Sequence, residues 1–146
     1  LLHAPDAEII FTSGATQAMQ LFWNSFKMTL HDGDEVLYAR DDHEAITKPL
    51  QQSAQDITLK SYRRRSTGDI DVEHIKKLIT SKTKAIFVTH VHNIYGTDSD
   101  IHKLRDIVGP DVVIIADCAQ SVGHMDVSMK KAKSGRALLL RTQNVC

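Results

Sequence analysis

Short apolar runs alternate along this chain with longer stretches in which apolar residues recur every three or four positions. The short runs predict strands at 8–12, 35–39, 57–62, 85–88 and 112–116, and the longer stretches predict helices at 17–28, 44–53, 72–79 and 101–108. Strands that alternate with helices in this way predict an α/β fold with a mostly parallel sheet flanked by helices.

Two places in this pattern are less regular. Pro49 lies inside the predicted helix 44–53, where it argues against that helix or for a kink in it. Near the end of the chain, Leu138, Leu139 and Leu140 form an isolated apolar run. This run could be an improvised strand, and an altered reading frame, an unspliced intron or an alternative exon could equally have produced it.

The apolar run 112–116 ends abruptly at Asp117. An uninterrupted apolar run suits a strand that is covered on both faces, as in a parallel sheet. Ligands of open α/β sheets bind beyond the carboxyl ends of the strands, and a carboxylate there is costly unless a positive group meets it. Asp117 is therefore a candidate ligand-binding residue, although it could instead cap the following helix.

Two further segments carry candidate chemistry. In 12–17, small and hydroxyl residues open a helix directly after a predicted strand. The positive N-terminal end of such a helix is a phosphate site, with Thr16 as a hydroxyl donor, unless Ser13 or Thr16 simply caps the helix. In 89–97, Asn93 offers an amide before the turn at Gly96.

The histidines allow a metal site as an alternative. His90 and His92 are two positions apart, so they could point to one side of an extended segment. A zinc site would need a third ligand, for which Asp117 and His124 are the candidates. No ligand cluster supports this hypothesis in the sequence, and we expect no metal.

The composition is that of an ordinary globular protein. The 146 residues fit one domain or a large part of one, and 18 basic residues balance 18 acidic ones, so charge indicates no nucleic-acid or membrane partner. The basic run Arg63-Arg64-Arg65 is expected to be a solvated loop edge. Two cysteines indicate no disulfide framework and favour a reducing compartment, so we expect a cytoplasmic location; an organelle stays open because the chain does not begin with Met.

These pieces, taken in order, resemble the class V aminotransferase family of the fold-type I pyridoxal-phosphate enzymes, and most closely its cysteine desulfurase and selenocysteine lyase branch. The matching segments are 11–18, 33–36, 42–45, 67–71, 82–85, 89–97 and 116–124. The resemblance implies that residues 1–131 are part of the large domain that binds pyridoxal 5′-phosphate (PLP), followed by a divergent tail at 132–146.

The resemblance also implies a role for each candidate residue. Ala15 and Thr16 would hold the cofactor phosphate, and His43, the one catalytic residue expected in this chain, would stack on the pyridine ring. Asn93 would donate to the phenolic oxygen of the cofactor, and Gln120 would lie near it. Asp117 would pair with the pyridine nitrogen, because an ionised Asp keeps that nitrogen protonated and the ring an effective electron sink.

The lysine that binds PLP as a Schiff base in this family has no match in the chain. It should fall near 142–146, whereas Lys130, Lys131 and Lys133 come too early and lack the expected Ser and His neighbours. Cys118 lies beside Asp117 and is expected to be buried and inert.

We therefore expect a fragment that holds the non-covalent half of a PLP site and is inactive by itself. The full enzyme would be a homodimer that acts on a small amino acid, most like a cysteine desulfurase or selenocysteine lyase. The alternatives are a fragment of a true class V aminotransferase, or a truncated product that binds no cofactor and persists as a subunit-binding remnant.

Overall fold

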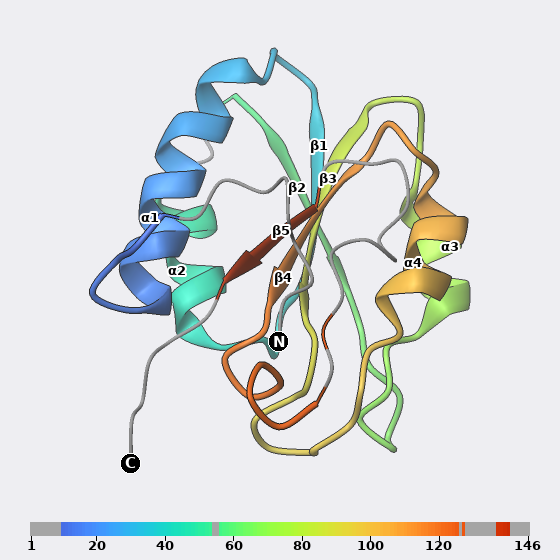
Figure 1. Cartoon of the computed structure of the whole chain (residues 1–146). Helices are drawn as coiled ribbons and strands as arrows, with labels where there is room; N and C mark the ends of the chain where they lie inside the picture. The colour runs from blue at the N-terminus through green and yellow to red at the C-terminus, as the bar shows by residue number, and fades with distance from the viewer. Residues whose placement is uncertain (1–9, 54–55, 126, 128–136, 141–146) are drawn as a thin grey trace.

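A five-stranded parallel sheet forms the centre of the molecule (Figure 1). A computed structural model describes residues 10–53, 56–125, 127 and 137–140. The strands are β1 (Glu35–Ala39), β2 (Thr58–Tyr62), β3 (Thr83–Thr89), β4 (Val113–Asp117) and β5 (Ala137–Leu140). Their order across the sheet is β2-β1-β3-β4-β5. The sequence prediction of an α/β fold with a mostly parallel sheet is confirmed.

Helices cover both faces of the sheet, and these helices are α1 (Ala15–Phe26), α2 (Glu44–Ser53), α3 (Val72–Leu78) and α4 (Ile101–Val108), with a 3-10 turn η1 (Lys27–Thr29) after α1. Figure 1 shows α1 and α2 on one face and α3 and α4 on the other. The helix α2 keeps its predicted bounds and runs through Pro49. None of the described helices has both the length and the apolar composition that a membrane-spanning segment requires.

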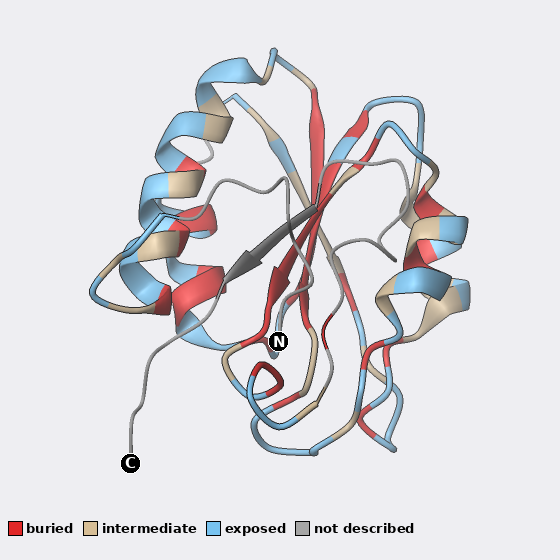
Figure 2. Cartoon of the chain, in the orientation of Figure 1, coloured by how far each residue is buried: buried red, intermediate tan, exposed pale blue. Residues whose placement is uncertain are grey.

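Alternate residues of each central strand enter two separate cores, because successive side chains of a strand point to opposite faces. In β1, Val36 and Tyr38 pack with the buried Trp23 of α1, whereas Leu37 and Ala39 join the core beneath α3 and α4. All five residues of β1 are buried (Figure 2). The sheet is thus covered on both sides, as the uninterrupted apolar runs predicted.

The predicted strand 8–12 is wrong where it can be compared. Residues 10–12 form no strand, and residues 8 and 9 lie outside the described part of the chain. Ile10 and Phe11 are 79% and 85% exposed. An apolar run becomes a strand only when another strand accepts its hydrogen bonds, and no described strand pairs with this segment.

The isolated apolar run near the end of the chain does form a strand. β5 pairs in parallel with β4, with Ala137 opposite Ile114 and Leu140 opposite Asp117. Part of the tail 132–146 therefore extends the sheet. The division of the chain at residue 131 stays a prediction.

Candidate functional site

The strand order creates a crevice at one end of the sheet. The connection from β1 to β2 contains α2 and lies on one face of the sheet (Figure 1). The connections from β2 to β3 and from β3 to β4 contain α3 and α4 and lie on the other face (Figure 1). The direction of the connections therefore changes between the neighbouring strands β1 and β3, which makes this the switch point of the sheet. This switch point is where open α/β sheets bind ligands. A cavity of about 240 Å³ lies there, and its lining residues are Ala15, Thr16, His43, Ala45, Thr89, Val91, Asn93, Asp117, Ala119 and Gln120.

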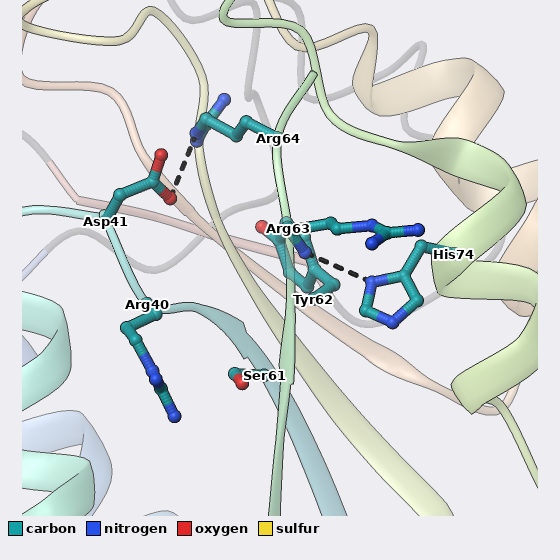
Figure 3. A pocket seen from close by; sticks show the side chains of 7 residues that line it. All are labelled: Arg40, Asp41, Ser61, Tyr62, Arg63, Arg64 and His74. Atoms are coloured by element: carbon teal, nitrogen blue, oxygen red, sulfur yellow. Dashed lines mark hydrogen bonds and ion pairs between the residues drawn. The ribbon is translucent and has the colours of Figure 1, made fainter. Parts of the chain in front are cut away.

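All six residues predicted to bind the cofactor line this one cavity. They come from the start of α1, the loop after β1, the loop after β3, the end of β4 and the loop after β4. The largest sequence separation among them is that between Ala15 and Gln120, so only the fold brings them together. A second cavity, of about 450 Å³, contains none of the six (Figure 3).

Asp117 is the buried acid of the site. It is 5% exposed, and its Oδ1 accepts a hydrogen bond of 2.9 Å from the backbone N–H of Ala119. Burial raises the pKa of the Asp117 carboxyl above its ordinary value, while that hydrogen bond and the neighbouring His43 oppose the rise. A carboxylate in such surroundings is stabilised by any cation that the cavity admits.

His43 lines the cavity and directly precedes α2. Its Nδ1 accepts a hydrogen bond of 3.1 Å from the N–H of Ala45, so the proton of the neutral ring is on Nε2. Its backbone oxygen accepts from Ile46 and Thr47 at the start of the helix. The ring is thereby oriented while its side chain stays exposed. From the sequence alone, a histidine at the start of a helix could also be a simple surface residue, and that interpretation would explain its exposure but not its position in the cavity wall.

The first turn of α1 carries no side-chain cap. Gly14 precedes the helix, and neither Ser13 nor Thr16 caps it. Thr16 is instead the second residue of the helix and lines the cavity beside Ala15. The N–H groups of a helix start that no side chain covers favour an anion, which agrees with the phosphate hypothesis.

Two amide side chains face the same cavity from neighbouring loops. Asn93 follows β3 and Gln120 follows β4, and both are exposed. Among the described residues, neither amide group has a hydrogen-bond partner. The loop of Asn93 is held by the buried His92, whose Nδ1 accepts from the N–H groups of Ile94 and Tyr95.

The histidines proposed for zinc do not converge. His90 lies 2.8 Å from Ser121 Oγ through Nδ1 and 3.2 Å from Asp98 through Nε2, whereas His92 contacts the backbone oxygen of Asp41. In the described part of the chain, the one group of three metal-capable side chains consists of Asp41, Asp42 and His92. Arg64 Nη2 lies 2.7 Å from Asp42 Oδ1, so a guanidinium already supplies positive charge there.

Two residues near the site differ in how well the sequence predicted them. Cys118 is buried as expected, and burial raises the pKa of its thiol to about 12. Thr89 lines the cavity but was not predicted, although it ends β3 opposite Asp117 in the register of the two strands. The signal that could have found Thr89 is its position at a strand end, the same position that singled out Asp117.

Comparison with known proteins places this geometry in a family. Residues 1–134 match the family profile described as aminotransferase class-V. A probable cysteine desulfurase of Halalkalibacterium halodurans is 32% identical over 135 residues, which cover 89% of this chain and 33% of that protein. A cysteine desulfurase of Yersinia pestis is also 32% identical, over 88% of this chain and 33% of its own length.

Solved structures give the same picture. The apo cysteine desulfurase of Thermococcus onnurineus NA1 superimposes with a TM-score of 0.78 and 25% identity over 86% of this chain and 32% of its own. A methionine aminotransferase of Escherichia coli, with a TM-score of 0.71 and 19% identity over 90% of this chain and 36% of its own, shares the fold. The chain spans about a third of the length of these relatives. With the profile match over most of its length, the chain belongs to the class V aminotransferase family.

Proposed function

We propose that this chain forms the non-covalent part of a PLP site in an enzyme of the cysteine desulfurase type. The observation that carries the proposal is the single cavity that gathers all six candidate residues at the switch point of the sheet. The relatives named cysteine desulfurase support the amino-acid chemistry.

The residues in the cavity fit three of the polar groups of PLP, namely its phosphate, its ring nitrogen and its phenolic oxygen. The uncapped first turn of α1 suits a dianionic phosphate, and the buried Asp117 suits a protonated ring nitrogen. Asn93 and Gln120 offer amide N–H groups to a phenolic oxygen. The cofactor, once bound, supplies an electron sink for bonds at the amino-acid substrate.

The side chains divide the work of binding. Asp117, held by the Ala119 N–H, would keep the ring nitrogen protonated in surroundings that strengthen the ion pair. His43 presents a flat imidazole, whose orientation is set by the Ala45 N–H, for stacking on the ring. Each of these two side chains is already oriented by a backbone N–H before any ligand arrives, which lowers the cost of binding.

The cavity is smaller than a complete site of this kind. Its volume of about 240 Å³ lies below the range of roughly 300–1,000 Å³ that is usual for small-molecule pockets. We expect the remaining walls, the lysine and the substrate-binding groups to come from outside the described residues, and from a second subunit in a homodimer. The substrate would be a small amino acid, with cysteine favoured, and the enzyme would be cytoplasmic.

The test is binding of pyridoxine 5′-phosphate, measured by equilibrium dialysis. This ligand keeps the phosphate, the ring nitrogen and the phenolic group of PLP but lacks the aldehyde, so it cannot react with surface lysines. We expect one saturable site, weakened by the single variants Asp117→Asn and His43→Ala but not by Glu73→Gln, which changes an exposed residue of α3. Absence of saturable binding, or binding that all three variants leave unchanged, would overturn the proposal.

A further inference from the structure

The side chain of Arg64 is buried, although Arg64 belongs to the arginine run that the sequence predicts to be a solvated loop edge. The side chain of Arg64 is 2% exposed, whereas that of Arg63 is 72% exposed and Arg65 is also exposed. The prediction is therefore wrong for the middle arginine. A charge pattern along the sequence cannot reveal that one member of the run meets a buried acid 22 positions earlier.

The Arg64 guanidinium contacts the loop that follows β1. Its Nη2 donates to Asp42 Oδ1 at 2.7 Å, and the Asp42 side chain is fully buried. Its Nε lies 3.6 Å from Asp41 Oδ1, and Figure 3 shows the guanidinium directed toward that carboxylate. Asp42 immediately precedes His43 in the chain. Arg64 thus anchors the segment from which the His43 ring projects.

The same arginine is connected to the loop that carries Asn93. Arg64 Nη1 donates to the backbone oxygen of Gly68 at 3.2 Å, and Thr97 Oγ1 donates to that same oxygen at 3.0 Å. Gly68 has φ +91°, and a Cβ added there would lie 2.5 Å from Tyr95 Cβ. The turn after β2 therefore packs tightly against the loop of residues 91–97.

A third contact joins the two site loops directly. Because His92 Nδ1 accepts from two N–H groups, the proton of the neutral ring is on Nε2, which donates to the backbone oxygen of Asp41 at 3.3 Å. The loops of His43 and Asn93 are thus linked to each other and to the turn of residues 64–68. Among the described residues, the polar partners of Arg64 are Asp41, Asp42 and Gly68, and none of them belongs to the start of α1.

We propose that Arg64 is a positioning residue of the candidate cofactor site, holding the His43 and Asn93 loops through Asp42 and Gly68 without lining the cavity itself. The inference rests on the proposed function, because the ligand that it concerns is the one proposed there. Arg64 supports the loops that would bind the pyridine ring but not the start of α1 that would bind the phosphate, so its loss should affect the two binding interactions unequally. Loss of Arg64 weakens binding of the ring and leaves binding of a phosphate at α1 unchanged.

Two variants test this inference. Arg64→Lys keeps the charge but loses the planar fork that contacts Asp42 and Gly68 together. The double variant Asp42→Asn with Arg64→Met removes both charges, so neither charge is left buried without its partner. This variant keeps the inference testable if Arg64→Lys fails to fold. The matched control is Ile75→Val, which trims a fully buried residue of α3 whose core cluster contains no residue of the His43 or Asn93 loop.

The measurements are the dissociation constants of pyridoxine 5′-phosphate and of inorganic phosphate for each variant. We expect both Arg64 variants to bind pyridoxine 5′-phosphate about three- to tenfold more weakly, with inorganic phosphate unchanged, and the control to match the parent chain for both ligands. Equal weakening for both ligands, no weakening, or the same loss in Ile75→Val would overturn the inference.

A measurement without ligand separates this inference from the proposed function. The Ala45 N–H donates to His43 Nδ1, so its hydrogen exchange reports the order of the His43 loop. We expect faster exchange at Ala45 in both Arg64 variants but not in Ile75→Val. A parent chain that binds no pyridoxine 5′-phosphate refutes the proposed function, whereas unchanged exchange and binding in the Arg64 variants refute only the positioning role.

Discussion

Replacing Asp117 with Asn should make the chain more stable and its cofactor site weaker. The substitution keeps the shape of the side chain and an oxygen that can accept the 2.9 Å hydrogen bond from Ala119. What it removes is a negative charge on a residue that is 5% exposed. The stability of the free chain and the affinity for ligand therefore change in opposite directions.

The sign of the stability effect follows from the pKa. Burial raises the pKa of Asp117 above its ordinary value of 3.8, so the folded chain holds the proton more tightly than the unfolded chain. The stability of the parent chain falls as the pH rises from 3.8 through the raised pKa, and it stays lower at neutral pH. Asn cannot ionise, so at pH 7 we expect a gain of about 1 kcal/mol in the free energy of unfolding. Below pH 3.8 the two chains should converge.

The loss of affinity comes from the missing charge opposite the ring nitrogen. Hydrogen bonds to charged groups contribute roughly 1.5–3 kcal/mol, and 1.4 kcal/mol corresponds to a factor of ten. We therefore expect roughly 10- to 100-fold weaker binding of pyridoxine 5′-phosphate.

Urea denaturation at several pH values measures the stability, and equilibrium dialysis measures the affinity. The Asp106→Asn variant changes an exposed acid of α4 that has no ion pair within the described residues, so it serves as the control and should change neither. A variant at Asp117 that is less stable at pH 7, or that binds as tightly as the parent chain, would refute this reasoning.

Three further outcomes are expected. Phe87→Ala should lower the free energy of unfolding, measured by urea titration, by about 3–5 kcal/mol. The reason is that Phe87 is fully buried and packs edge-on against Trp23, with 5.9 Å between the ring centroids. A loss below about 1 kcal/mol would contradict this. Burial raises the pKa of the Cys118 thiol to about 12, so this thiol should not react with iodoacetamide at pH 8 until urea unfolds the chain. Mass spectrometry of the peptide that contains Cys118 measures the labelling, and rapid labelling of the native chain would contradict the prediction. The chain should self-associate through its sheet edges and exposed residues such as Ile10 and Phe11, and light scattering after size exclusion that found a single monomer would show this to be wrong.

Local sequence pattern was a good guide to the elements. The strand 35–39 and the helices 44–53 and 101–108 have the predicted bounds, because each is defined by its own periodicity and flanking polar residues. Asp100, for example, caps α4 by accepting from the N–H groups of His102 and Lys103. The segment 8–12 failed because a strand needs a neighbour, which lies beyond what a local pattern contains.

The candidate site was predictable to the extent that it lies at strand ends. Asp117 and Asn93 follow apolar runs, and parallel strands bring such ends to the same edge of the sheet. The resemblance to a known family then supplied an expected role for each residue, and those roles stay predictions. The sequence did not indicate Thr89 as part of the cavity wall, nor the connection of Arg64 to Asp42.

What the sequence by itself determined is therefore the order and type of the elements between residues 15 and 117, the two-sided burial of the sheet and the identity of the residues at its strand ends. These follow from periodicity and from the cost of burying polar groups, which act over a few neighbouring positions. Only the tertiary structure decided which strands are neighbours, that the six candidate residues line one cavity, and that one arginine of three is buried against Asp42. Those contacts join residues that are far apart in the chain, and their energies depend on burial that exists only in the packed fold.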